Sequence, residues 1–302
     1  MKERAALVGA VLVLFGGLGV WAFVAERPER PPELSLSRPP SPPIGVAARA
    51  DEGAPERQLL ERAMLGGIPR LRLFARSGVP VFGIVSPGRE AVALRDRIRS
   101  AGGDRVPVVV GDAWAVDAHA TAIATTGDRP DAIVRRAAGL DAEAWLRARA
   151  RAALAQEGTW PEDASERALP ERYGVVRDRQ RDLVLPEVAI ALLPAGDPVE
   201  APAWLAYGNW DGCPEPTVHV AVLTRWRDRW GAEVVAIGED RIELRVARPP
   251  TDRDGAMVLA REHAAYAPAL VGGGTRTIAA LAAERLGARS WSFRWPRRTR
   301  VP

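Results

Sequence analysis

The chain has 302 residues, of which 47% are hydrophobic and 26% are charged, so it is long and apolar enough to bury a core. Its formal net charge is only +4 and its acids and bases are interspersed, whereas a nucleic-acid-binding protein concentrates basic residues on one face. The single cysteine excludes an internal disulfide and a zinc site built on cysteines. We therefore expect no nucleic acid among its partners.

Residues 5–25 are an uncharged, apolar run at the start of the chain. As a helix they would span about 30 Å, the thickness of the hydrocarbon core of a membrane. Lys2 and Arg4 precede the run, which favours a cytoplasmic N-terminus, although arginines also follow it. A cleaved signal peptide is the alternative, but Phe23 and Val24 fit the small-x-small cleavage pattern poorly. We predict an uncleaved, single-pass transmembrane anchor over residues 1–26.

Residues 27–57 are predicted to link this anchor to the folded part of the chain. The stretch from Arg27 to Gly45 reads RPERPPELSLSRPPSPPIG. So many prolines favour extended polyproline II structure over a helix or a central strand. The interpretation is a stiff spacer that holds the folded region away from the membrane.

An N-terminal α/β region is predicted over residues 58–182. It begins with a short helix over 58–65, then a buried strand over 79–85, a helix containing Ala91 and Ile98, and a second strand over 106–110. A strand, helix, strand order with short links predicts two parallel strands. A strong helix follows over 141–156, and the charged stretch 158–182 is interpreted as a connector.

A C-terminal α+β domain is predicted over residues 183–302. Its first strand covers 188–193, and a helix opened by Pro214 and Pro216 ends at Gly231. Strands over 233–237 and 241–246 form a hairpin, and the alternation in the second predicts one face exposed to water. Helices opened by Thr251 and Thr275 and a strand over 290–295 complete it. The predicted fold class is α/β (α+β): a mixed sheet flanked by helices, after one transmembrane helix and a proline-rich linker.

Several motifs in this last region occur in a characteristic order and spacing. They are Trp210 with Cys213-Pro214, then HVAVLTRW, WGAEVVAIGED, LRVARPPT, LAREHAAYAP, GTRTIAALAAERLG and WSFRWP. On these motifs the C-terminal hundred residues resemble the bacterial domain of unknown function 4253 family. The resemblance implies a small mixed α/β domain and no established reaction.

The chain departs from the family pattern at its most polar positions. Asp211 stands where the family has asparagine, and Pro296 stands where the terminal aromatic motif closes with aspartate. Tyr266-Ala267-Pro268-Ala269 replaces the usual Tyr-Cys-Pro-Asp. If those polar groups do chemistry in the family, this chain has lost most of them, which argues against an active enzyme.

The candidate catalytic residues are Cys213, His263 and Asp211. A cysteine thiol becomes a nucleophile when a neighbouring base removes its proton, and either His219 or His263 could be that base. A cysteine beside tryptophan and proline is more often a small buried hydrophobic residue. Catalysis by this group is therefore the less favoured interpretation.

The candidate binding residues are Trp210, Arg248, Tyr266, Trp291 and Trp295. Trp291 and Trp295 alternate with Phe293 on the last strand, so they share one side that is either core or an aromatic binding surface. Arg248, in the Arg-Pro-Pro corner, could clamp a carboxylate. Gly272-Gly273-Gly274-Thr275 could seat a phosphate, although no P-loop lysine follows. No metal-binding spacing occurs and no cofactor is predicted.

These observations lead to an expected function. We expect a bacterial protein anchored in the cytoplasmic membrane, with its folded region outside the cytoplasm, that acts as a non-catalytic binding or interaction module for a protein or small ligand. The alternatives are an enzyme, either a hydrolase or thiol-dependent, that uses Cys213 and a histidine, and an immunity-like envelope protein that neutralises a toxin.

Overall fold

The structure, a computed structural model, describes residues 44–49, 51–152, 157–162, 171–178, 181–271 and 277–295. These residues belong to one compact unit that begins at Ser41. The predicted anchor, most of the predicted linker and the glycine run 272–275 lie outside the described residues. Within the described ranges, no helix combines the length and apolar character needed to cross a membrane.

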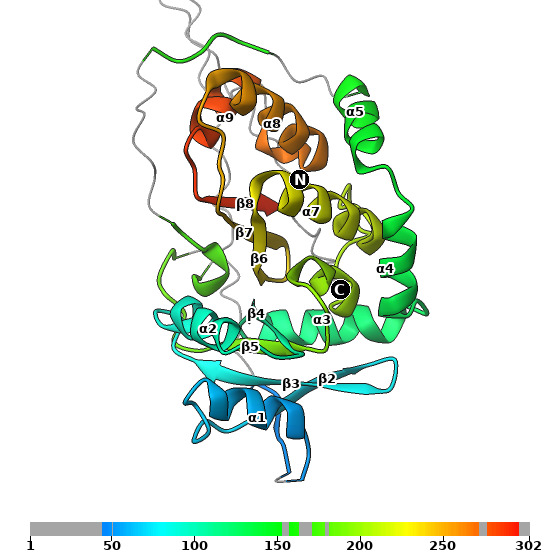
Figure 1. The fold of residues 1–302 in the computed structure, drawn as a ribbon, viewed down its shortest axis with the longest axis vertical. Helices are drawn as coiled ribbons and strands as arrows, with labels where there is room; N and C mark the ends of the chain where they lie inside the picture. Colours follow the sequence, from blue (N-terminus) through cyan, green and yellow to red (C-terminus); the bar gives the residue numbers. More distant parts are fainter. Residues whose placement is uncertain are drawn as a thin grey trace, which may run out of the picture. The chain divides into compact units, whose positions relative to one another are not determined.

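One mixed sheet of eight strands organises the described part of the chain (Figure 1). Its spatial order is β1-β2-β3-β5-β4-β6-β7-β8, and all neighbouring strands are antiparallel except β4 and β6, which are parallel. The strands are β1 Val46–Ala47, β2 Leu71–Arg76, β3 Val79–Ser86, β4 Val106–Gly111, β5 Val188–Leu193, β6 Ala232–Ile237, β7 Arg241–Val246 and β8 Ser290–Arg294. The prediction of a mixed sheet flanked by helices is thus confirmed.

The strand β5 joins the two predicted regions into one sheet. It lies between β3 and β4 and is antiparallel to both, so β3 and β4 run in the same direction as predicted but are not neighbours. All six residues of β5 are buried. Val188, Ile190 and Leu192 face one hydrophobic core, and Ala189, Ala191 and Leu193 face the other, because successive side chains of a strand point to opposite faces.

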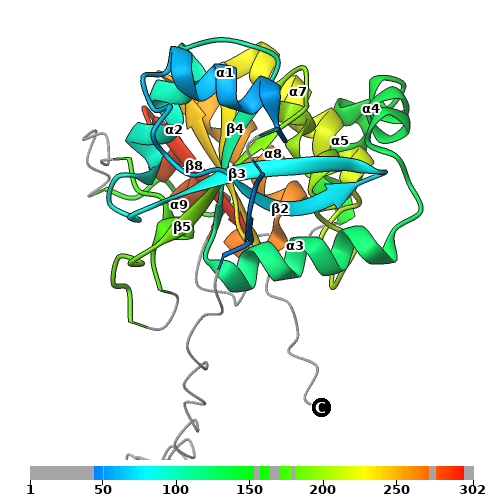
Figure 2. The same cartoon turned by 90° about the horizontal axis from the view of Figure 1, so that it is seen from below.

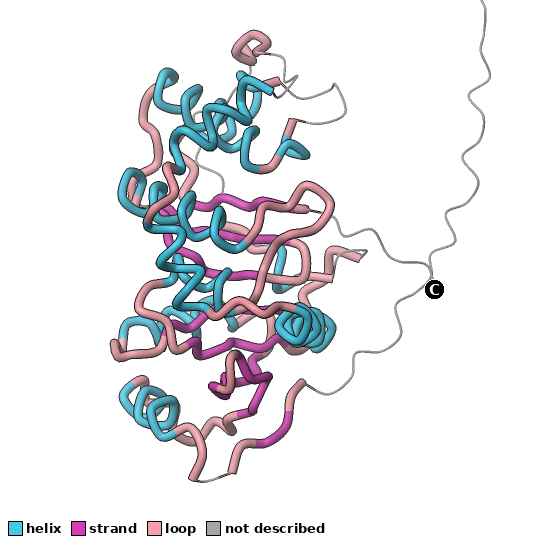
Figure 3. Tube along the Cα trace, turned by 90° about the vertical axis from the view of Figure 1, so that its right-hand side faces the viewer, coloured by secondary structure: helices cyan, strands magenta, loops and turns pink. Residues whose placement is uncertain are grey.

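Nine helices within the described ranges cover the two faces of the sheet. Helices α1 and α2 pack against one face, and α3 lies on the opposite face (Figure 2). Figure 3 shows the strands beside one another through the centre of this unit. The helices are α1 Ala54–Arg62, α2 Ala91–Ser100, α3 Ala113–Thr125, α4 Pro130–Ala138, α5 Ala142–Ala152, α6 Ala201–Trp204, α7 Pro216–Trp230, α8 Arg253–Tyr266 and α9 Ile278–Arg285. Three short 3-10 helices are η1 Gly174–Val176, η2 Pro198–Glu200 and η3 Pro268–Leu270.

Local signals explain where the long helices begin and end. Pro216 opens α7, and Gly231, with a φ of 63°, ends it in the left-handed conformation, as predicted. The side chain of Asp252 accepts a hydrogen bond from the Gly255 amide, so Asp252 caps α8 in place of the predicted Thr251. Likewise Thr277, not Thr275, caps α9 through the Ala280 amide.

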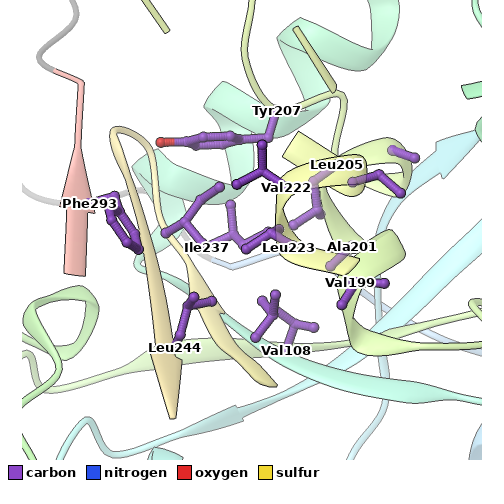
Figure 4. Packing of buried hydrophobic residues seen from close by; sticks show 14 of the residues in the cluster. Val108, Val199, Ala201, Leu205, Tyr207, Val222, Leu223, Ile237, Leu244 and Phe293 are labelled. Atoms are coloured by element: carbon purple, nitrogen blue, oxygen red, sulfur yellow. The ribbon is translucent and has the colours of Figure 1, made fainter. Parts of the chain in front are cut away.

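The larger core lies between the sheet and α7. Figure 4 shows Val222 and Leu223 of α7 packed with side chains from the sheet and from the η2–α6 segment. Burial of this many aliphatic side chains, each contributing about 1.5–3 kcal/mol, supplies the main stabilisation of the fold. It also fixes the position of α7 on the sheet.

The prediction of a wet face on β7 is wrong at Glu243, which is only 1% exposed. The segment that the sequence suggests to be a connector returns here as η1 and covers the strand. The amides of Gly174 and Val175 donate to the Glu243 carboxylate at 2.7 and 3.0 Å, and the Ser292 hydroxyl donates at 3.2 Å. Burial raises the pKa of Glu243, and these bonds to its carboxylate oppose the rise.

Candidate functional site

The only cysteine ends a loop, residues 206–213, that leads from α6 towards α7. The cysteine amide donates to the Trp210 carbonyl at 2.5 Å, which closes a tight turn. Five residues of the loop have positive φ: Ala206, Gly208, Asn209, Asp211 and Gly212. Non-glycine residues adopt this conformation only where the surrounding structure holds them, and such backbone strain concentrates at functional sites.

Gly208 brings the loop backbone directly against the side chain of His219. Its φ is 117°, and a Cβ atom at this position would lie 2.0 Å from the Pro214 carbonyl oxygen and 2.9 Å from His219 Nε2. Only glycine therefore fits here. The loop closes over the imidazole as a backbone wall.

Below this wall, three polar side chains form a hydrogen-bonded chain. Cys213 Sγ lies 3.4 Å from His219 Nε2, and His219 Nδ1 lies 2.5 Å from the Tyr266 hydroxyl. His219 comes from α7 and Tyr266 from the last turn of α8, so the chain ties the loop to both helices. The three residues are 6%, 0% and 0% exposed.

Aromatic rings enclose this chain. The rings of Tyr207, Tyr266 and Trp295 lie around the imidazole of His219, with centroid distances of 5.3, 5.4 and 5.2 Å. The edge-to-face geometry of the last two contributes about 0.5–1.5 kcal/mol per pair beyond simple burial. Water is therefore kept away from the imidazole.

The protonation state of His219 follows from its partners. Burial lowers its pKa to about 3, so the ring is neutral at physiological pH. The Tyr266 hydroxyl has one hydrogen-bond partner in the described part, His219 Nδ1, and burial, followed by the nearby Cys213, raises the pKa of Tyr266. The hydroxyl thus donates to Nδ1, and the ring proton sits on Nε2, where it points at the cysteine sulfur and the Pro214 carbonyl.

This arrangement does not activate the thiol. A nitrogen that already carries a proton cannot accept the thiol proton, and an imidazole with a pKa of about 3 is a weak base for a group that ordinarily titrates near pH 8.5. In this state the chain is a neutral, buried hydrogen-bond network. It stabilises the contact between the loop, α7 and α8.

His263 lies in a different environment from Cys213. Its Nδ1 accepts a hydrogen bond of 3.0 Å from Arg285 Nε, and its ring packs on Trp226, Trp291 and Phe293. Burial, and then the charge of Arg285, lower its pKa well below the usual value. Of the two histidines considered from the sequence, the structure brings His219 to Cys213.

The other candidates from the loop and the Arg-Pro-Pro corner have structural contacts. Asp211 is exposed in the tight turn, and the half-buried Trp210 donates through Nε1 to the Trp295 carbonyl at 3.2 Å. The Arg248 guanidinium donates to the Asp228 carbonyl at 2.9 Å, at the C-terminal end of α7. A cation there complements the negative end of the helix dipole.

The aromatic residues of β8, and Trp295 directly after it, are in the core. Trp291, Phe293 and Trp295 share one face as predicted and are 1%, 0% and 3% exposed, whereas Ser292 and Arg294 face outwards. They extend the aromatic packing around both histidines. They do not form an exposed aromatic surface.

A cleft that the sequence does not reveal lies beside α7. It has a volume of about 460 Å³ and is lined by α4, the start of α5, η2 and the outward side of α7. Figure 1 shows α4 beside α7. Its lining residues include aliphatic side chains, acids and two arginines, but no cysteine, serine or histidine. These elements are separated along the chain, so spacing alone could not have identified the cleft.

The described residues hold no group of three or more His, Cys, Asp or Glu side chains that could bind a metal ion. Many acids among the described residues instead form ion pairs with arginines, such as Asp131 with Arg135 and Glu157 with Arg261.

Comparison with known proteins gives a match in the part of the chain that contains the cysteine. Residues 189–296 match the model of a domain of unknown function (DUF4253). No curated protein and no solved structure matches the chain. The matched range includes β5 to β8 and the whole Cys213–His219–Tyr266 chain. The resemblance of the C-terminal region to this family, expected from the sequence motifs, is thus confirmed over residues 189–296.

Proposed function

We propose that this chain is a membrane-anchored bacterial binding or interaction module that catalyses no reaction of its own. Residues 5–25 would anchor it by a single pass in the cytoplasmic membrane, and the folded region would lie outside the cytoplasm. The uncharged N-terminal run and the proline-rich stretch after it support this arrangement.

One contrast carries the proposal. The Cys213–His219–Tyr266 chain, which has the clearest potential for chemistry, is closed inside the core with its ring proton directed at the thiol. The lining of the open cleft beside α7 contains neither cysteine nor histidine. A surface that is concave and partly apolar is suited to binding.

Capture from native membranes tests the proposal. A tagged full-length chain is cross-linked in intact cells, purified and compared with the Cys213→Ala variant. The proposal expects the same partner from both, because the thiol plays no part in binding. Recovery of no partner, or loss of the partner with Cys213→Ala alone, would contradict it.

The proposed orientation requires a separate measurement. The native thiol is buried, so an exposed reporter is needed: Glu187→Cys in a Cys213→Ala background, since Glu187 is exposed just before β5. A membrane-impermeant thiol reagent is expected to label this variant in spheroplasts. Labelling only after lysis would place the folded region in the cytoplasm.

A thiol-dependent enzyme is the second candidate, favoured by the 3.4 Å contact between Cys213 and His219 under a loop with strained backbone. Opening of that loop would expose the sulfur and the imidazole together. This candidate predicts that a small electrophile such as iodoacetamide labels Cys213 in the native protein faster than it labels a free thiol. Protection of Cys213 until the protein unfolds would exclude it.

A further inference from the structure

The cleft beside α7 has an apolar floor and a charged rim. Its aliphatic lining, called the floor below, comes from Val134 and Leu140 of α4 and the turn after it, from Val199 of η2 and from Val220 of α7. The rim carries five carboxylates, those of Asp141, Glu143, Asp197, Glu200 and Asp228.

Two guanidiniums, Arg225 and Arg227, offset part of this charge, which leaves an excess of three negative charges at the rim. Both are committed to ion pairs. Arg225 bridges Glu143 and Glu262 at 2.9 and 3.0 Å, and Arg227 pairs with Asp197 at 3.0 Å and with Asp228 at 2.8 Å.

Asp141 and Glu200 have no basic partner among the residues that the structure describes. One oxygen of Asp141 accepts from the Ala144 amide at 2.9 Å, and one oxygen of Glu200 accepts from the Gly196 amide at 3.0 Å. The second oxygen of each carboxylate is left for another donor. Two carboxylates without a basic partner among the described residues thus line the cleft together with the aliphatic side chains.

The chemistry of the cleft selects one class of occupant. The described acids are too dispersed to bind a metal ion. An arginine or lysine side chain has an aliphatic stem and a cationic head, which match the apolar floor and the acidic rim. Resting on the proposed binding function, we propose that this cleft binds a segment of a partner protein that presents arginine or lysine side chains.

The variants Asp141→Asn and Glu200→Gln, combined in the full-length chain, test this assignment. Each keeps the oxygen that accepts the backbone amide and removes only the charge, so the fold should be retained. Glu187→Gln, an exposed acid outside the cleft lining, is the matched control. The probe is a short fluorescent peptide of alternating arginine and leucine, with citrulline in place of arginine as its uncharged counterpart.

The wild-type chain and Glu187→Gln are expected to bind the arginine peptide roughly tenfold more tightly than the citrulline peptide, because only arginine is attracted by the two carboxylates. A tenfold difference in affinity corresponds to about 1.4 kcal/mol of binding free energy. The double variant should lose this preference, and added salt should weaken it. An unchanged preference in the double variant would overturn the assignment, as would equal competition by spermidine.

The capture experiment separates this inference from the proposed function. A partner that the double variant still captures as well as the wild type would remove the cleft assignment and leave the binding function standing. A partner lost with the double variant but kept with Glu187→Gln would support both.

Discussion

Replacing Tyr266 by phenylalanine is the most direct perturbation of the buried hydrogen-bond chain. The ring and its packing remain, but His219 Nδ1 loses its donor at 2.5 Å inside the core. An unsatisfied buried polar group costs about 1–3 kcal/mol. We expect the free energy of unfolding to fall by that amount.

The single thiol provides the assay. Cys213 is the only cysteine in the chain and is 6% exposed, so a thiol reagent can label it only when the protein opens locally or unfolds. Because about 1.4 kcal/mol corresponds to a tenfold change in an equilibrium, Tyr266→Phe should accelerate labelling by roughly 5- to 150-fold. The measurement uses full-length protein in mild detergent and a chromogenic disulfide reagent.

Tyr173→Phe is the matched control. The Tyr173 hydroxyl donates to Glu171, which is partly exposed, so water can replace the lost bond and labelling should change little. A change of less than about twofold in Tyr266→Phe would show that the bond adds no net stability. Equally fast labelling of native and denatured wild-type protein would refute the burial of the thiol itself.

Three further results are expected. The pKa of His219 is about 3 in the folded protein and near 6.5 in the unfolded protein, so between these pH values the unfolded state binds the extra proton. The stability that depends on this group is therefore fully present above about pH 6.5 and falls below it by up to about 1.4 kcal/mol per pH unit. Urea unfolding followed by tryptophan fluorescence measures it, and a free energy of unfolding that stays constant from pH 7 to 5 would contradict this. Gly208→Ala should lower the free energy of unfolding by about 3 kcal/mol or more. Gly212→Ala, whose added Cβ has no atom within 4 Å, should lower it by about 1 kcal/mol. Equal urea-unfolding midpoints for the two variants would argue against the close approach of Gly208 to His219. Glu243→Ala leaves the buried amide of Val175 and the half-buried amide of Gly174 without an acceptor, which should cost about 1–3 kcal/mol and lower the melting temperature. Glu187→Ala should leave the melting temperature unchanged.

Local patterns predicted the elements of the fold better than their arrangement. The buried run 188–193, the hairpin predicted over 233–246 and the helix that opens at Pro216 and ends at Gly231 all appear as expected, because periodicity, proline and glycine act within a few residues. The insertion of β5 between β3 and β4 is a pairing across about a hundred residues. No local signal specifies it.

In the candidate site too, contacts between residues close in the sequence were easier to predict than contacts between distant segments. Cys213 and His219 are six residues apart, so their proximity was one of two options that the sequence left open. Tyr266, their third partner, comes from another helix and was considered only as a binding residue. The burial of Glu243 also depends on a distant segment, η1, which alternation along a strand cannot reveal.

Because of the position of β5, the range that the family model matches is shorter than the part of the chain that folds as one unit. The matched range begins at residue 189, but both neighbours of β5 in the sheet, β3 and β4, precede that range. During synthesis the edges of β3 and β4 that pair with β5 stay unpaired until β5 has left the ribosome. The entropy of closing such long loops is therefore lost late in folding. A fragment restricted to residues 189–296 would expose both edges of β5 and should aggregate. Expression and domain-exchange experiments on this chain should therefore begin upstream of β1.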